Sequence, residues 1–280
     1  MEKKLLVKIK NFLPVTVIFI MTACIVAILI SSLNKPINIK TSLENVSSSS
    51  ISSSSKESSS DIISVPSVNP NNYSRIKTLQ EALSINSDTI GWLYVPGTTL
   101  NLPIVQTKNN DYYLKKSIYK NYAWKGWPFA DFRDVWSPLP KNLIIYGHNM
   151  GDGDLFGELK KFTNLSFLNS NPILYFSTPS KKYYWKIFAV YITDKNFNYI
   201  QTNFKDNEEF LSFIFKNKAR SLFNTSVDVA ASDSILTLST CTYEFHEAYF
   251  VVMARLIRPG ETQLVAVATV NPKPLSPHNK

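Results

Sequence analysis

Leu236-Thr237-Leu238-Ser239-Thr240-Cys241 is the stretch from which the rest of the chain can be interpreted. Its alternating and β-branched residues favour a buried extended strand. Cys241 then stands at the carboxyl end of that strand, where a side chain can face a cleft. The other cysteine, Cys24, lies in an apolar N-terminal segment, so Cys241 has no evident disulfide partner. A single cysteine in such a place is a candidate nucleophile if a histidine can be found for it.

His148 is the histidine that we pair with Cys241. It ends the stretch Asn142-Leu143-Ile144-Ile145-Tyr146-Gly147-His148, an apolar strand that runs into a polar turn. Two strands that end on cysteine and histidine can meet at one edge of a sheet. A thiolate there could attack a carbonyl, and the imidazole could protonate the leaving group. A buried structural cysteine and a turn histidine are the alternatives that the residue types leave open.

Five short segments, in a fixed order along the chain, resemble class B sortases. They are residues 89–98 (TIGWLYVPGT), 129–133 (FADFR), 146–150 (YGHNM), 153–159 (GDLFGEL) and 238–241 (LSTC). Each segment alone is weak, but their shared order makes the resemblance specific over roughly residues 73–259. It implies a mostly β fold, the closed sortase β-barrel, with an N-terminal helix. A second helix is expected in the long connection before the cysteine strand.

The same resemblance implies a cysteine transpeptidase with Cys241 as nucleophile and His148 as proton donor. Such an enzyme cleaves the C-terminal sorting signal of a surface protein, usually after its threonine, and holds the acyl group as a thioester. An amine of peptidoglycan or its precursor then accepts the acyl group. If water accepted it instead, the enzyme would be a hydrolytic cysteine protease, and residue types do not distinguish the two outcomes. Ser239 and Thr240 are further candidates for contact with the substrate or the oxyanion.

Tyr249 stands where the resemblance leads us to expect an arginine, on the strand after the cysteine. A tyrosine hydroxyl can donate a hydrogen bond but brings no fixed charge. Losing a charged donor at a developing oxyanion could cost about 2–4 kcal/mol. Arg255 lies about 20 Å farther along the strand, so Arg133 from another loop is the better candidate to replace it. The alternative prediction is therefore a sortase-like domain that binds sorting signals with weak or no turnover.

The first 72 residues have the composition of a membrane anchor and a tether. Residues 1–10 form a basic tail, and residues 11–34 carry no charged side chain. At about 1.5 Å per residue, that run can cross a hydrocarbon core of about 30 Å. The lysines predict a cytoplasmic N-terminus and an extracellular catalytic domain. Residues 35–72 are rich in serine and are expected to form a flexible tether. A cleaved signal peptide and a lipoprotein signal at Cys24 fit less well, because the apolar run is long and continues past that cysteine.

Residues 73–272 are expected to form the catalytic domain, and residues 273–280 a C-terminal tail. Ser74, Asp154 and Asp206 are candidate caps for three helices, since their side chains can accept from free helical N–H groups. Helices are expected at residues 76–85, 155–162 and 206–215, and strands at residues 92–95, 102–105, 142–146, 173–177, 183–191, 235–240 and 249–257.

The net charge of +9 comes from 30 basic and 21 acidic residues that are mixed along the chain. This mixing indicates a solvated surface, which would also suit an anionic wall or membrane, and not a nucleic-acid site. No His and Cys cluster has zinc spacing. Asp152 and Asp154 lack the rest of a calcium loop, so we expect no metal or cofactor. His246 is expected to be a loop residue, and His278 a residue of the tail without a catalytic role.

Overall fold

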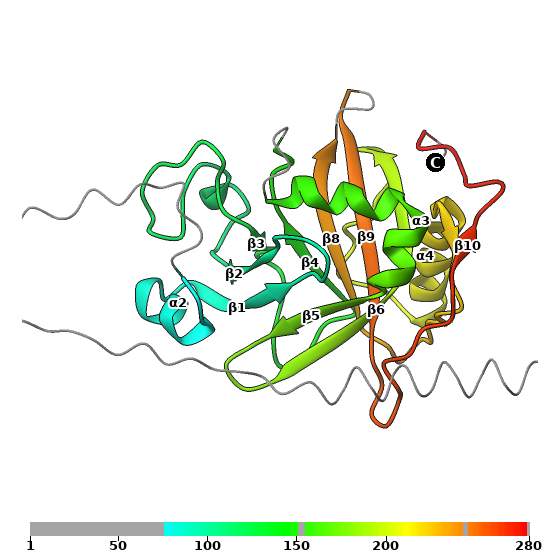
Figure 1. The fold of residues 1–280 in the computed structure, drawn as a ribbon, viewed down its shortest axis with the longest axis horizontal. Coiled ribbons are helices and arrows are strands. Elements are labelled where there is room, and N and C mark those ends of the chain that lie inside the picture. The colour runs from blue at the N-terminus through cyan, green and yellow to red at the C-terminus, as the bar shows by residue number, and fades with distance from the viewer. Residues whose placement is uncertain (1–75, 151–154, 243–245, 279–280) are drawn as a thin grey trace, which may run out of the picture. The chain divides into compact units, whose positions relative to one another are not determined.

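The structure is a computed structural model that describes residues 76–150, 155–242 and 246–278 (Figure 1). For Cys241 and Thr242 the description covers the backbone alone. The predicted anchor and tether, and also Asp152 and Asp154, lie outside the described residues. Within those residues, no helix combines the length and the apolar character needed to span a bilayer. The same residues contain no group of three or more His, Cys, Asp or Glu side chains suited to a metal ion.

Eight strands form a closed barrel (Figure 1). Most neighbours are antiparallel, but β2 pairs with β3 and β4 pairs with β8 in parallel. The mostly β, closed-barrel fold predicted from the sequence is thus confirmed. Around the barrel the order is β1 (Thr89–Tyr94), β2 (Asn101–Val105), β3 (Phe129–Ala130), β4 (Asn142–Tyr146), β8 (Ile235–Thr242), β9 (Ala248–Leu256), β6 (Lys182–Asp194) and β5 (Ile173–Ser177), which pairs with β1. A separate two-stranded sheet contains β7 (Phe223–Asn224) and β10 (Thr269–Val270).

One helix precedes the first strand of the described residues, and the others lie in connections between strands. The expected N-terminal helix is α2 (Leu79–Ile85), and the expected helix before the cysteine strand is α4 (Asn207–Arg220). Asp206 caps α4 as predicted, because its Oδ1 accepts from the backbone N–H of Glu209 at 2.9 Å. The cap assigned to Ser74 was wrong, since α2 starts later and Thr78 accepts from Glu81 N at 3.1 Å. The remaining helical segments of the described residues are α3 (Leu165–Ser170) and the 3-10 helices η2 (Tyr112–Leu114) and η3 (Phe156–Thr163).

Two apolar clusters explain why β8 is buried on both faces from Ile235 to Thr240. Leu236 and Leu238 belong to a cluster that also contains residues of β1, β2, β4, β6 and β9 and fills the barrel. Ile235 belongs to a second cluster, in which the other faces of β6 and β9 pack against α4. Each buried large aliphatic side chain contributes about 1.5–3 kcal/mol relative to exposure. The strand that leads to the cysteine is therefore fixed from two sides.

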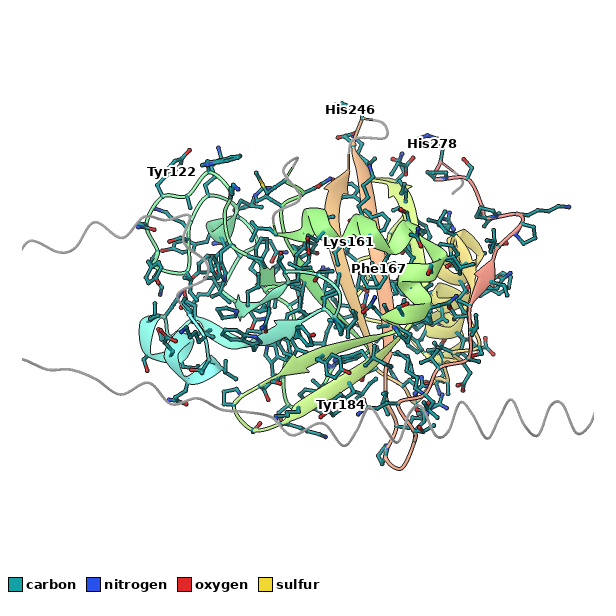
Figure 2. All side chains as sticks on the ribbon, viewed as in Figure 1. Tyr122, Lys161, Phe167, Tyr184, His246 and His278 are labelled. Carbon is teal, nitrogen blue, oxygen red and sulfur yellow. The ribbon has the colours of Figure 1, made fainter. Side chains whose placement is uncertain are left out.

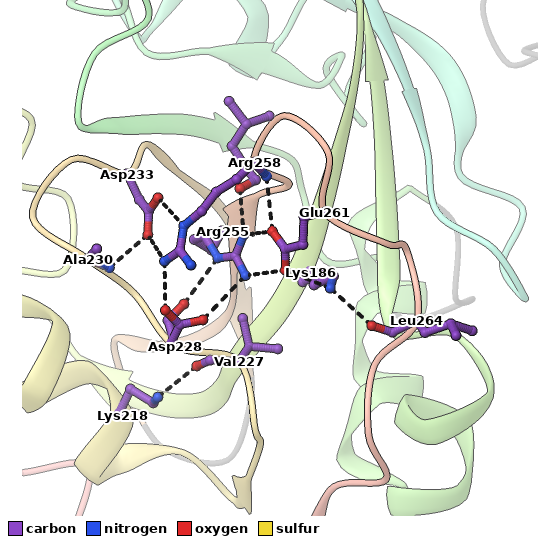
Figure 3. A network of polar contacts seen from close by, with 11 residues as sticks. Lys186, Lys218, Val227, Asp228, Ala230, Asp233, Arg255, Arg258, Glu261 and Leu264 are labelled. Atoms are coloured by element: carbon purple, nitrogen blue, oxygen red, sulfur yellow. Dashed lines mark hydrogen bonds and ion pairs between the residues drawn. The ribbon is translucent and has the colours of Figure 1, made fainter.

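A network of charged side chains lies at the carboxyl end of β9, far from the end that pairs with Cys241 (Figure 3). The side chain of Arg255 is only 1% exposed and binds Glu261 through two nitrogens, one of them at 2.8 Å from Oε1. Buried Lys186 donates to the same Oε1 at 2.7 Å. The Arg255 hydrogen bonds, aided by Lys186, outweigh partial burial and hold the pKa of Glu261 well below its usual range. Glu261 thus neutralises two buried cations and ties the segment after β9 to β6.

Replacing Glu261 with glutamine is expected to lower the free energy of unfolding by about 3 kcal/mol near neutral pH. Lys186 loses its carboxylate partner, and the carboxylate contact that Arg255 keeps among the described residues is the longer one with Asp228, at 3.6 Å. A depressed carboxyl pKa stabilises the fold above the unfolded-state value, about 4.5, and this contribution fades as pH falls. The difference between wild type and Glu261→Gln should therefore shrink in acid. Urea unfolding at several pH values measures it, with exposed Glu208→Gln as control. Equal stability of wild type and Glu261→Gln near neutral pH would contradict the role of this network.

Deleting residues 1–72 is expected to leave a soluble domain that unfolds in one cooperative transition. All strands of the barrel and both apolar clusters lie within the described residues, which begin at residue 76. Circular dichroism during thermal unfolding of the truncated chain is the measurement. A broad, non-cooperative transition or aggregation at low temperature would show that the domain boundary is misplaced.

Candidate active site

The ends of β4 and β8 lie at the same edge of the barrel. Their parallel ladder runs from Asn142 opposite Ile235 to Tyr146 opposite Ser239, and Gly147 N donates to Ser239 O at 3.2 Å. His148 stands two residues after the end of β4, and Cys241 lies within β8, two residues beyond Ser239. The backbone thus has the arrangement expected from the sequence, in which the strand ends that carry His148 and Cys241 meet at one edge of the sheet.

Gly147 is required where the chain passes from β4 to His148. A Cβ atom at this position would lie 2.5 Å from the ring of Phe156, which is fully buried in the barrel cluster. Atoms this close would have to move, and the neighbouring ring is held by the core. Only glycine therefore lets the backbone between β4 and His148 pass this close to the Phe156 ring.

A cavity of about 320 Å³ opens at this edge. It brings together four of the predicted site residues, His148, Ser239, Thr240 and Tyr249, whereas Arg133 is not among the residues that line it. The walls come from the segment around η2, from β3, from the end of β4, from the connection between β6 and α4, and from β8 and β9. The lining residues are Asn110, Asp111, Leu114, Phe129, Tyr146, Gly147, His148, Tyr199, Ser239, Thr240 and Tyr249.

His148 is half-buried and is oriented by a backbone contact. Its Nε2 lies 2.9 Å from the carbonyl oxygen of Leu114. A carbonyl oxygen can only accept, so Nε2 carries the proton in this contact. This hydrogen bond fixes the plane of the imidazole at the rim of the cavity.

Tyr249 occupies the position on β9 directly opposite Cys241 on β8. Directly opposed residues of an antiparallel pair have Cα atoms about 4.5–5.5 Å apart. The ring of Tyr249 packs against Tyr199 with centroids 5.8 Å apart, and the Tyr199 hydroxyl lies 2.9 Å from Ser239 Oγ. Tyr199, Ser239 and Tyr249 thus form one wall of the cavity. The Oγ1 of Thr240 is buried and has no hydrogen-bond partner among the described residues.

Arg133 forms a bidentate pair with Asp131, with Nε at 2.8 Å from Oδ1 and one terminal nitrogen at 2.7 Å from Oδ2. The Tyr146 hydroxyl also donates to Oδ2, at 2.8 Å. Burial opposes ionisation of Asp131, but the hydrogen bonds from Arg133 and Tyr146 outweigh it, so its pKa is lowered. At neighbouring Asp134, burial raises the pKa to about 8. Asp131 therefore carries the negative charge of this loop, and Arg133 is occupied in neutralising it.

The family model of the sortase domain matches residues 93–257, which is more than half of the chain. The chain belongs to the sortase family. Among curated relatives, sortase B of Listeria monocytogenes is 37% identical over 181 residues, which cover 64% of this chain and 74% of the relative. A solved Staphylococcus aureus sortase B–substrate complex has a TM-score of 0.61 at 35% identity, covering 64% of this chain and 84% of that one. The solved sortase B of Clostridium perfringens has a TM-score of 0.62 at 33% identity, covering 65% and 100%. These similarities confirm the predicted class B assignment.

Several lining residues of this sortase site were not singled out from the sequence. Tyr146, which lines the cavity, and Asp131, which lies behind it, fall inside two of the family segments, so the segments could have suggested both. Asn110 and Tyr199 stand in irregular connections, and Leu114 ends the three-residue helix η2, so none of them belongs to a periodic pattern. They reach the cavity only through the tertiary fold, and nothing in their local sequence indicates this.

The two remaining histidines, labelled in Figure 2, are not among the residues that line the cavity. The side chain of His246 is 93% exposed in the turn before β9, where it lies 3.7 Å from Glu247. His278 Nδ1 lies 3.1 Å from Asp194 Oδ2. Neither position suits a second base for chemistry in the cavity.

Proposed function

We propose that this chain is a membrane-anchored cysteine transpeptidase of the class B sortase type. Its substrate would be the C-terminal sorting signal of secreted surface proteins, and its acceptor an amine of peptidoglycan or its precursor. The observation that carries the proposal is the parallel pairing of β4 and β8, which brings His148 and the backbone of Cys241 to one edge beside a cavity of about 320 Å³. The Staphylococcus aureus relative solved with substrate supports a peptide ligand.

In the proposed reaction, the Cys241 thiolate attacks the carbonyl carbon of the scissile peptide bond. The tetrahedral intermediate collapses, the C–N bond breaks, and His148 gives its proton to the departing amine. The acyl group is then held as a thioester. An incoming amine attacks that thioester, loses a proton to His148, and forms a new amide as the thiolate leaves. The sum is one amide exchanged for another, without an oxidant or a cofactor.

Peptide recognition is assigned to the polar groups along the cavity. Thr240 Oγ1, which has no hydrogen-bond partner within the part of the chain that the structure describes, and the hydroxyl of Ser239 can meet backbone groups of an extended peptide. Buried polar atoms cost free energy unless a partner is supplied. A bound sorting signal would supply one to Thr240.

The anchor remains part of the proposal, since residues 1–72 lie outside the described residues. A cytoplasmic basic tail, an apolar span and a serine-rich tether would place the catalytic domain outside the cell. Surface proteins and peptidoglycan both occur on that side. No nucleic-acid partner is proposed, because basic and acidic residues are mixed along the chain.

A second candidate function is binding of sorting signals with weak or no turnover. One observation favours it: the described residues that line the cavity include no lysine or arginine. Tyr249 stands opposite Cys241 in place of a fixed positive charge. Hydrolysis of the thioester by water is the third outcome and differs from transpeptidation only in the acceptor.

Cys241→Ala is expected to abolish thioester formation while sorting-peptide binding and the melting temperature stay nearly unchanged. His148→Ala should lower turnover by about 100-fold or more, because the amine leaves poorly without a proton donor. Mass spectrometry of the acyl-enzyme and of products, with peptide and amine libraries, measures both. Turnover by a folded Cys241→Ala variant would remove the assigned nucleophile. Products containing water alone would identify a protease.

Tyr249→Arg is expected to raise the acylation rate about tenfold, which corresponds to about 1.4 kcal/mol of recovered oxyanion stabilisation. Tyr249→Phe tests the hydroxyl, whose loss should slow acylation without unfolding the domain. Single-turnover thioester formation measures both variants. If phenylalanine matches wild type and arginine gives no gain, Tyr249 acts only in packing against Tyr199.

A further inference from the structure

The carboxylate of Asp131 accepts more hydrogen bonds than a simple ion pair requires. It is completely buried and accepts from three nitrogens of Arg133, one of them the backbone N–H at 2.9 Å. It also accepts from the Tyr146 hydroxyl at 2.8 Å and from Asn110 Nδ2 at 3.1 Å. Charge-assisted hydrogen bonds of this kind are the strong and geometrically specific ones. The carboxylate therefore fixes each donor in place.

The groups held by this carboxylate belong to separate walls of the cavity. Asn110 comes from the segment before η2, and its Oδ1 also accepts from Phe132 N at 2.9 Å. Tyr146 ends β4, two residues before His148, and its ring packs 5.4 Å from Phe129. Arg133 itself donates to the carbonyl of Ile200 at 3.1 Å, next to Tyr199. Segments far apart in the chain are thus joined behind the cavity through one charged pair.

We propose that Asp131 is a positioning residue for the sorting peptide: it holds Asn110 and Tyr146 in the geometry that binds the peptide, with Arg133 as its counter-ion. This inference rests on the proposed function of the same cavity. Asp131 does not line the cavity, so its action passes through the residues it holds. Misplacing such groups by about 1 Å can cost an enzyme about 100-fold in rate.

The chain contains a matched control at Asp233. This aspartate is also buried and forms a bidentate pair with Arg258, at 2.9 and 2.7 Å, in the network beyond the end of β9 (Figure 3). Neither Asp233 nor Arg258 lines the cavity. Asp233→Asn breaks an arginine–aspartate pair that resembles the Arg133–Asp131 pair in geometry and burial. Its residues do not line the cavity where the peptide would bind. This variant separates loss of stability from loss of positioning.

The experiment compares Asp131→Asn and Asp233→Asn in the full-length chain. The probes are the best peptide from a sorting-signal library and iodoacetamide, which alkylates Cys241 without needing the peptide. We expect Asp131→Asn to lower kcat/KM for the peptide by about tenfold or more, mainly through KM. Alkylation of Cys241 should stay within about twofold of wild type. Asp233→Asn should lower the melting temperature but leave both rates within that range.

The proposal is overturned if Asp131→Asn keeps kcat/KM within about twofold of wild type, or if Asp233→Asn reduces it equally. If wild type forms no thioester with any peptide, the proposed function fails, and amide hydrogen exchange then decides about Asp131. Faster exchange in residues 107–114 and 144–149 of Asp131→Asn alone would support the positioning role. Unchanged exchange in those segments would overturn it.

Discussion

Five residues of β4 pair in parallel with five residues of β8, from Asn142 opposite Ile235 to Tyr146 opposite Ser239. Parallel neighbours end at the same edge of a sheet, whereas antiparallel neighbours end at opposite edges. Over five residues at about 3.3 Å each, the difference is about 16 Å. With parallel strands the histidine and the cysteine lie at the same edge and can act on one substrate. With antiparallel strands they would be about 16 Å apart, too far to do so. Parallel pairing also requires a long crossover, and residues 147–234 supply it while contributing β5, β6 and α4 to the fold.

Buried polar groups attach the rest of the site to this ladder. Thr237 on β8 donates to Asn142 Oδ1 on β4 at 2.7 Å, and Asn142 Nδ2 donates to Gln201 O at 2.9 Å. The connection between β6 and α4 is thereby held against the strands, and it carries Tyr199 to Ser239. Such groups are costly to leave unpaired, so they favour one arrangement over near alternatives. The Asp131 cluster acts in the same way on the other side of the cavity.

The sequence predicted the longer strands because they are buried in alternating or continuous apolar patterns. The two-residue strands β3, β7 and β10 were not predicted, because they are too short to carry such a pattern. β5 matches the predicted residues 173–177, and β6 is longer than predicted because its ends, Lys182 and Asp194, are polar. The start of the N-terminal helix differs from the prediction, since Ser74 and Thr78 are both residue types that cap helices and only packing decides between them. The backbone positions of Cys241 and Tyr249 follow from the hairpin β8–β9. The cavity walls that come from loops, which include Asn110 and Tyr199, could not be predicted. The local sequence of a loop does not indicate which other loops the barrel places beside it.

The charges around the cavity show why Tyr249 matters. Arg255 shares β9 with Tyr249 but is buried against Glu261 at the strand's far end, and Arg133 is held by Asp131. Arg255 and Arg133, the two candidates to replace the arginine expected at position 249, are thus both bound to carboxylates. Oxyanion stabilisation in the proposed reaction then depends on dipoles held in place beforehand, which are effective because they need no reorganisation during the reaction. The Tyr249 ring is held by Tyr199, whose hydroxyl contacts Ser239. A flexible arginine at the same position would gain charge but would lose this aromatic support.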